Sequence, residues 1–261
     1  MRYGIRDGCL PGYALEDVFS TAGELGFDSV ELDIGAEFET SEMWTESGRR
    51  QIAAWQSESG AELSSVCLGA LWTYSFGDGD AGVRTTARDA TLHTIEACAE
   101  VGARWILLPV TPGADVSDEE AVAHWIEEVG ACAEKAAECE VFLALENVGR
   151  GYAQSAEGLL EIASAVNSPW VRAYYDFGNG LSLGNDPVAE MHLLGTDWIT
   201  ILHAKDPGGQ LLGEGKVDFA AVVDAVKKIG YDGYIVLETP GTDDPRGAAQ
   251  HNLAFLRKGF G

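Results

Sequence analysis

Short β-type runs of apolar residues alternate with longer amphipathic segments along the whole chain. The pattern repeats about every 30 to 40 residues, which is typical of stacked β–α units. The predicted strands are Tyr3–Arg6, Ser29–Asp33, Leu63–Leu68, Trp105–Pro109, Val141–Glu146, Val171–Asp176, Trp198–His203 and Tyr234–Glu238. The predicted helices are Leu15–Leu25, Ser47–Ser59, Arg84–Val101, Asp118–Ala137, Ala156–Val166, Pro187–Leu194, Phe219–Ile229 and Arg246–Arg257.

Eight strand–helix pairs favour a closed barrel over an open doubly wound sheet, because a last helix follows the final strand and completes the ring. The predicted strands are apolar on both faces, as expected of buried parallel strands. The 261 residues are 46% apolar, which is enough for one large core, and no linker divides the chain. We therefore predict an α/β protein with a single (β/α)8 TIM-barrel domain over residues 1–261. No glycine-rich phosphate-binding signature accompanies the strands.

Four consecutive predicted strands end in a residue that is costly to bury, on the face where barrel active sites lie. The segments LALEN, AYYDFGN, TILHAKD and YIVLETP carry Glu146, Asp176, His203 and Glu238 at these ends. Three carboxylates around one centre would repel each other and lose hydration, at a cost of several kcal/mol. A divalent cation removes this conflict, and an oxygen-rich set with one nitrogen suits Mn²⁺, Mg²⁺, Co²⁺ or sometimes Zn²⁺.

Each of these residues also has a simpler structural interpretation. A strand-end glutamate can cap the next helix, Asp176 can form a turn with the amides around Gly178, and His203 can be a satisfied core histidine. The matching positions in four consecutive strands favour the metal centre. A non-catalytic sugar-binding barrel would instead pair the carboxylates with arginine or lysine, but no strand-end cation accompanies Glu146 or Glu238 in the sequence.

The charge of the chain excludes some partners. The sequence has 42 acidic and 17 basic residues, six of them lysines, and a formal net charge of −25. Such a surface repels nucleic acid and anionic membranes, and it suggests a halophilic host in which salt screens the repulsion. Five scattered cysteines without a C-x-x-C pair are expected to be buried thiols. With no long apolar run and no secretory signal pattern, we expect a cytoplasmic protein.

The chain resembles the sugar phosphate isomerase/epimerase family of the xylose isomerase-like TIM-barrel superfamily. The resemblance spans nearly the whole length and is carried by GFDSVELD (26–33), LENVGRG (145–151), YYDFGNGL (174–181), LHAKD (202–206), GEGKVDF (213–219) and VLETP (236–240). It implies one divalent metal ion, Mn²⁺ first among the candidates, bound by the four strand-end residues. It also implies that Glu146 and Glu238 are catalytic, one removing a proton beside a ketose carbonyl and the other returning it through a metal-stabilised enediolate.

Three departures from the better-known ketose 3-epimerases limit this resemblance. Those enzymes usually have a histidine where this chain has Asn179, an arginine where it reads DPGGQ (206–210), and a further glutamate where it reads NVGRGY (147–152). The predicted substrate is therefore a small ketose, sugar phosphate or keto-acid. A dehydratase or lyase acting on a keto-inositol or a similar keto-polyol is the alternative. The related endonuclease IV branch is disfavoured, because its three zinc ions need more histidines than this chain offers.

Further residues are candidates for contact with a sugar-like substrate. Glu31 ends the second predicted strand, and Lys205 points to the same side as His203 at a spacing of two. The other candidates are Asn179, Trp72, Glu214 and Arg150, in loops after strands. Each also has a local structural interpretation, such as a helix cap, a salt bridge or an oligomer interface. The resemblance also makes a homo-oligomer, either a dimer or a tetramer, an expected state.

Overall fold

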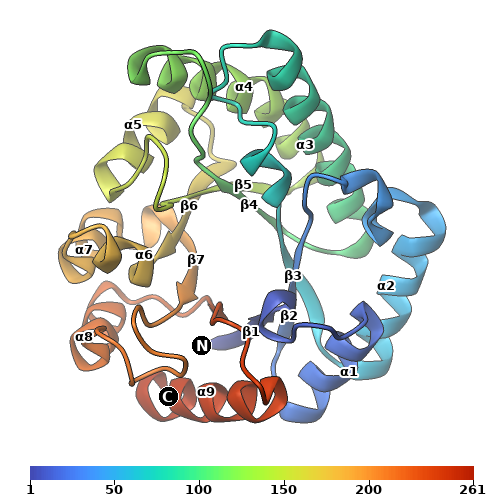
Figure 1. The fold of residues 1–261 in the computed structure, drawn as a ribbon, viewed down its shortest axis with the longest axis vertical. Coiled ribbons are helices and arrows are strands. Elements are labelled where there is room, and N and C mark those ends of the chain that lie inside the picture. Colours follow the sequence, from blue (N-terminus) through green and yellow to red (C-terminus); the bar gives the residue numbers. More distant parts are fainter.

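The computed structural model describes residues 1–261 and shows eight parallel strands that close into one barrel (Figure 1). The strands are β1 (Arg2–Arg6), β2 (Ser29–Asp33), β3 (Glu62–Cys67), β4 (Trp105–Pro109), β5 (Phe142–Glu146), β6 (Val171–Asp176), β7 (Ile199–Ala204) and β8 (Tyr234–Leu237). Their order around the ring follows the sequence, and pairing of β1 with β8 closes it. The predicted single-domain (β/α)8 TIM barrel is confirmed.

Helices surround the barrel on the outside (Figure 1). They are α1 (Leu15–Leu25), α2 (Glu46–Ser59), α3 (Ala81–Val101), α4 (Asp118–Cys139), α5 (Ala156–Val166), α6 (Phe177–Ser182), α7 (Pro187–Trp198), α8 (Phe219–Ile229) and α9 (Pro245–Phe260), with short 3₁₀ turns η1 (Asp7–Cys9), η2 (Phe38–Thr40), η3 (Glu42–Trp44) and η4 (Gly69–Trp72). The short helix α6 was not predicted. No helix combines the length and apolar character needed to cross a lipid bilayer.

Local sequence signals fix where the helices begin and end. Ser117 accepts a hydrogen bond from the Glu120 amide, and the Glu120 side chain accepts one from the Ser117 amide, which together cap α4. Gly26 and Gly102 follow α1 and α3 with φ values of 90° and 85°, a backbone region that glycine adopts without strain. These signals explain why most predicted helices lie within a few residues of the observed ones.

The barrel has two separate apolar regions. A cluster of 62 buried residues fills the space between strands and helices. The smaller cluster, which lies inside the barrel, consists of Cys67, Leu107, Ala144, Tyr174, Ile201, Tyr234 and Val236. Because side chains alternate across a strand, residues two positions further along β5, β6, β7 and β8 also face inward, at the C-terminal end of the barrel. Those residues are Glu146, Asp176, His203 and Glu238.

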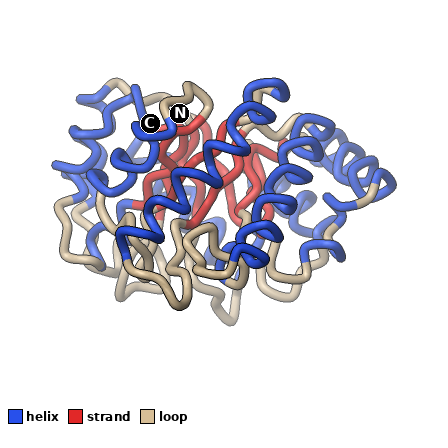
Figure 2. Tube along the Cα trace, turned by 90° about the horizontal axis from the view of Figure 1, so that it is seen from above, coloured by secondary structure: helices blue, strands red, loops and turns tan.

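The two ends of the barrel differ in their loops. Most of the long loops gather at one end, whereas both chain termini lie at the other (Figure 2). The end with the long loops holds the C-terminal ends of the strands. All five cysteines are free; four are buried and Cys139 is half-buried, as the sequence suggested. The fold therefore presents one structured face on which strand-end side chains converge.

Candidate metal centre

Four side chains that can bind a metal converge at the C-terminal end of the barrel. Glu146 and Asp176 end β5 and β6, His203 is the penultimate residue of β7, and Glu238 directly follows β8. Asp176 pairs with His203 in the sheet register, so these strand ends lie at the same level. One ligand atom from each of the four residues lies within 4.8 Å of the others. The structure brings together the set predicted from the strand ends.

His203 lies at the centre of this group and is fully buried. Its Nδ1 atom is 2.9 Å from Glu146 Oε1, 3.4 Å from Glu238 Oε2 and 3.9 Å from Asp176 Oδ2. Its other ring nitrogen, Nε2, is 2.8 Å from Glu31 Oε1. The imidazole therefore presents one nitrogen to the three carboxylates and the other to a fourth carboxylate deeper in the barrel.

The two oxygens of Asp176 have different surroundings. Oδ1 accepts a hydrogen bond from the Asn179 amide at 2.8 Å and caps α6, which is the local role that a simple structural interpretation assigns to this residue. Oδ2 lies 2.9 Å from Lys205 Nζ. The side chain of Asn147 holds the Asp176 backbone by accepting from its amide and donating to its carbonyl, each at 2.9 Å. These contacts fix the carboxylate with Oδ2 directed at the cluster.

Two buried carboxylate oxygens in the cluster, Asp176 Oδ2 and Glu238 Oε2, share a single ammonium group. Lys205 Nζ lies 2.9 Å from the first and 2.5 Å from the second. One cation between two buried carboxylates leaves negative charge in excess. Two such oxygens beside an imidazole nitrogen fit a divalent cation such as Mn²⁺ or Mg²⁺, which prefers oxygen ligands.

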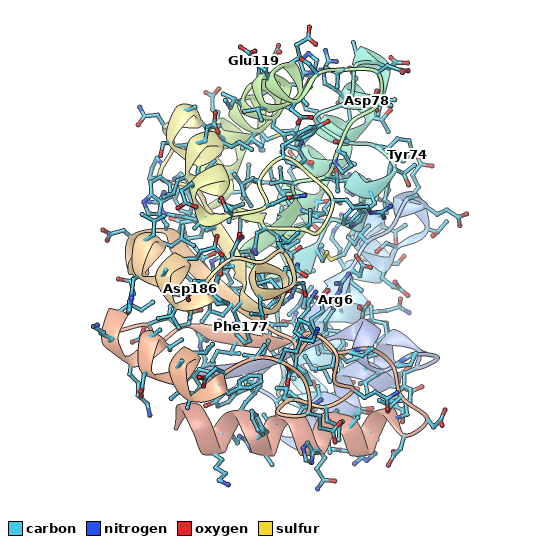
Figure 3. The ribbon with its side chains drawn as sticks, turned by 60° about the vertical axis from the view of Figure 1, so that its left-hand side comes forward. Arg6, Tyr74, Asp78, Glu119, Phe177 and Asp186 are labelled. Atoms are coloured by element: carbon cyan, nitrogen blue, oxygen red, sulfur yellow. The ribbon has the colours of Figure 1, made fainter.

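Cations at the ends of β1 and β7 contact the cluster, which corrects the expectation that none accompanies Glu238. Arg6 ends β1 and bonds to Glu238 through Nη1, while its Nη2 is 3.0 Å from Asp33 Oδ2. Arg6 lies near the centre of the view in Figure 3, whereas Glu119 lies at its upper edge. The predicted closed barrel already made β1 and β8 neighbours, but a contact between their end residues was not predicted. Glu146 contacts no lysine or arginine.

Negative charge exceeds positive charge in this network. Its carboxylates are Glu31, Asp33, Glu146, Asp176 and Glu238, and its cationic groups are Arg6, Lys205 and His203. With His203 protonated, five carboxylates against three cations leave a deficit of two positive charges, and with His203 neutral, as a metal ligand must be, the deficit is three. A divalent cation supplies most of that charge, so the residues present fit a metal centre despite the two salt-bridging side chains.

The environment shifts the pKa values of the carboxyl groups in the cluster in opposite directions. Burial raises the pKa of Glu146 to about 7, although its hydrogen bond to His203 acts the other way. Burial also raises the pKa of Asp176, against the charge of Lys205. Burial acts to raise the pKa of Glu238 too, but the charges of His203, Lys205 and Arg6 outweigh it and lower this pKa. Such separation is typical of paired acid and base groups.

The candidate substrate-binding residues near the cluster have specific partners. Glu31 is fully buried and its carboxylate contacts His203, so the structure does not present it to a substrate. The side chain of Asn179 donates from Nδ2 to the backbone carbonyl of Asn147 at 2.9 Å, and its Oδ1 accepts from Lys205 Nζ at 3.2 Å. Lys205 is one-quarter exposed. Lys205 and Asn179 thus form a polar edge on the α6 side of the cluster.

The remaining candidates lie in the loops at the same end. The Arg150 guanidinium lies 5.3 Å from the centre of the Trp72 ring, which joins the loops after β5 and β3. Glu214 is exposed, and its carboxylate accepts a bond from the Leu211 amide. A cavity of about 550 Å³ between the loops after β1 and β2 is bounded in part by Asp33, which also contacts Arg6.

Sequence reasoning missed two residues of the site. Arg6 ends the first predicted strand, so the strand-end signal that singled out the four candidate ligands also applied to Arg6. Asn147 directly follows Glu146 in LEN, but its contact with the Asp176 backbone depends on strand pairing that one sequence does not reveal.

Fold and site define a (β/α)8 barrel with a candidate divalent-metal centre at the C-terminal ends of its strands. The profile of the xylose isomerase-like TIM barrel family matches residues 19–259. The chain belongs to this family. The predicted membership and the prediction of a sugar isomerase/epimerase-like enzyme are both confirmed.

Individual relatives carry names of sugar epimerases. The chain is 32% identical over 237 residues to "Putative L-ribulose-5-phosphate 3-epimerase SgbU" of Escherichia coli, covering 83% of this chain and 80% of that protein. A protein of the same name from Haemophilus influenzae is 30% identical over 257 residues, covering 91% and 88%. A solved L-ribulose 3-epimerase superposes with a TM-score of 0.87 at 19% identity, covering 99% of this chain and 94% of that one. At that identity, the superposition supports the fold.

Proposed function

We propose that this protein is a divalent-metal-dependent isomerase or epimerase that moves a proton beside the carbonyl of a small ketose, sugar phosphate or keto-acid. The observation that carries the proposal is the cluster of four ligand atoms within 4.8 Å of one another at the ends of β5 to β8. Glu146, Asp176, His203 and Glu238 would hold the metal, with Mn²⁺ as the first candidate.

Glu146 and Glu238 are the proposed proton-transferring groups. When bound, the cation would polarise the substrate carbonyl and offset the negative charge that develops on its oxygen. One carboxylate removes the proton and the other returns it, so one must start ionised and the other protonated or able to become so. Burial of Glu146, together with the charges of Arg6 and Lys205 beside Glu238, makes the two groups unequal before any substrate arrives.

A phosphorylated ketopentose is the first substrate to examine, because two relatives are named for L-ribulose 5-phosphate. In this proposal Lys205 and Arg150 meet the substrate's anionic group, and the Trp72 ring packs on a C–H face of the sugar. Asn179 holds Lys205 in position through its side-chain oxygen. The exposed Glu214 would bind a substrate hydroxyl.

Two alternatives use the same residues. A dehydratase acting on a keto-inositol or similar keto-polyol begins with the same proton removal and then expels water. A non-catalytic sugar-binding barrel is favoured by the contacts of Arg6 and Lys205 with Glu238, which neutralise part of its charge without a metal. The negative charge that Arg6, Lys205 and His203 leave uncompensated favours the metal enzyme over that alternative.

The deciding experiment measures bound metal and proton exchange in the same preparations. Wild type, Glu146→Gln and His203→Ala are loaded with Mn²⁺, desalted and analysed for metal, then incubated in D₂O with ketopentose 5-phosphates, free ketoses and keto-acids. We expect one metal per wild-type chain, less in the variants, and deuterium beside the carbonyl only with wild type. Glu62→Gln is the matched control, because Glu62 is exposed at the opposite end of β3.

The products distinguish the alternatives. An isomerase or epimerase conserves the mass of the substrate apart from deuterium, whereas a dehydratase product is lighter by one water. A wild type that binds sugar, holds no metal and exchanges no proton would establish the binding barrel instead. Manganese as the native metal, a dimer or tetramer, a cytoplasmic location and a high-salt host remain predictions.

A further inference from the structure

Glu31 is a buried carboxylate that the proton-transfer chemistry does not use. It lies on β2, is fully buried, and contacts three side chains from three other strands. Its Oε1 is 2.8 Å from His203 Nε2, while Oε2 is 2.6 Å from the Tyr174 hydroxyl and 2.7 Å from Ser65 Oγ. An ionised group is seldom buried this completely unless it has a specific partner.

The two hydroxyls determine which way this carboxylate faces. The Tyr174 phenol donates its O–H to Oε2, because a carboxylate can only accept. Ser65 Oγ donates to the same oxygen. Oε2 therefore already accepts two hydrogen bonds, and Oε1 is the oxygen left for His203. This division of the carboxylate is built from residues on β3 and β6, outside the cluster of metal ligands.

A carboxylate can only accept hydrogen bonds, so the His203 nitrogen that faces it must carry a proton. Nδ1 also faces a carboxylate, Glu146 Oε1 at 2.9 Å, so the ring can donate from both nitrogens. A metal ion that binds Nδ1 displaces its proton, and the single N–H of the neutral imidazole then stays on Nε2, facing Glu31. Nδ1 is the atom that faces Glu146, Asp176 and Glu238. Glu31 thus favours the tautomer in which Nδ1 can bind a cation held by Glu146, Asp176 and Glu238.

We propose that Glu31, held by Tyr174 and Ser65, is a positioning residue that fixes the ring orientation and tautomer of His203 for metal binding. This inference rests on the proposed function, because it requires the metal to bind at the His203 cluster. It gives Glu31 a role different from substrate contact. It also explains why Tyr174 lies inside the barrel with its hydroxyl on a carboxylate, where phenylalanine would fill the same space.

The test is the Kd for Mn²⁺, measured by isothermal titration calorimetry on wild type, Glu31→Gln and Glu31→Ala. Loss of a carboxylate that orients a metal-binding histidine weakens metal binding by about 10- to 100-fold. Glu31→Gln preserves shape, but if its carbonyl stays on the two hydroxyls, its amide faces Nε2 and favours the proton on Nδ1. We therefore expect this isosteric variant to lose metal affinity while keeping its fold.

Two neighbouring serines supply a matched pair of controls. Ser65 Oγ donates to Glu31, whereas the adjacent Ser64 Oγ donates to Ser29 Oγ and the Val30 carbonyl. Both are buried in β3, so alanine at either position removes one buried hydroxyl. Ser65→Ala should weaken Mn²⁺ binding by about threefold or more, a fraction of the effect expected for Glu31 itself. Ser64→Ala should leave the Kd unchanged.

The outcomes separate this inference from the proposed function. If wild type binds Mn²⁺ and Glu31→Gln binds it within about twofold, the positioning role is wrong and the metal centre stands. If wild type binds no divalent cation, the metal centre fails and this inference fails with it. A stability loss in Glu31→Gln with an unchanged Kd would show a purely structural carboxylate. Should Glu31→Ala not fold, Glu31→Gln and the serine pair still decide the question.

Discussion

The two ends of the barrel interior are built by the same strands but carry opposite kinds of side chain. At the N-terminal end, Trp105 and Tyr234 pack with ring centroids 5.6 Å apart, and the Arg2 guanidinium lies 4.0 Å from the Tyr234 ring centre. At the C-terminal end, the strand-end residues form the charged network around His203. Every second residue of a strand faces the barrel interior, and these residues serve packing at one end and chemistry at the other. A substitution near the N-terminal end should therefore affect packing, and one near the C-terminal end should affect chemistry.

Two buried tyrosines inside the barrel make the contrast specific. The Tyr174 hydroxyl donates to Glu31 at 2.6 Å, deeper in the barrel than the candidate metal centre. The Tyr234 hydroxyl, near the other end, has no hydrogen-bond partner. The tyrosine at the charged end thus contributes a polar contact, and the tyrosine at the apolar end contributes the volume of its ring. Polar partners matter at one end and volume matters at the other.

The largest effect is expected from the carboxylates of the charged end. Glu146→Gln and Glu238→Gln should each lower kcat/KM by about 10²- to 10⁴-fold, the range that a positioned acid or base contributes. The double variant should be little worse than the poorer single variant, because groups that act as one unit are not additive. Steady-state kinetics on the identified substrate measure both effects. Losses that multiply in the double variant would contradict a shared proton-transfer step.

The apolar end should respond in stability instead. Trp105→Ala removes a ring packed on Tyr234 and Phe142, so it should lower the free energy of unfolding by about 3 kcal/mol. Urea denaturation measures this change, and the Kd for Mn²⁺ should stay within about twofold of wild type. Trp72→Ala is the matched control, because Trp72 is 45% exposed at the charged end. An equal loss of stability in both variants would remove the distinction between the ends.

The sequence predicted the fold and the convergence of the four candidate ligands because both depend on signals within single strands. Apolar runs of strand length recur at regular spacing, and a polar residue at the end of such a run is conspicuous in Glu146 or Asp176. Strand-end position then translates directly into spatial proximity, since a parallel barrel gathers the C-terminal ends of its strands. The signals that mark helix ends are also local in sequence, as the cap at Ser117 illustrates.

Contacts between distant strands could not be predicted in the same way. The partner of Glu31 is His203, and the two lie on β2 and β7, which do not pair with each other. Their contact crosses the barrel interior, so it depends on ring diameter and side-chain length rather than on any local pattern. Arg6 contacts Glu238 only because β1 and β8 close the ring. Such contacts decide whether a strand-end residue touches substrate, metal or another side chain.

Metal removal should affect the charged end alone. Mn²⁺ at about 100 times its Kd should raise the free energy of unfolding by about 2.7 kcal/mol, because it binds only the folded chain. A chelator should reverse this gain, and His203→Ala should show none of it. Trp105→Ala should gain the same increment as wild type, measured by urea denaturation with and without Mn²⁺. A smaller increment in that variant would mean that the packing at the two ends is coupled.

The smallest effects come from the two tyrosine hydroxyls and give the sharpest comparison, because phenylalanine preserves the ring in both cases. Tyr174→Phe removes a donor from the buried Glu31, so it should lower the free energy of unfolding by about 1–3 kcal/mol. Tyr234→Phe removes a hydroxyl without a hydrogen bond and should change it by less than about 0.5 kcal/mol. Urea denaturation of the metal-free proteins measures both. Equal losses would show that the Tyr234 hydroxyl has a partner, such as a buried water, and that the apolar end also depends on polar contacts.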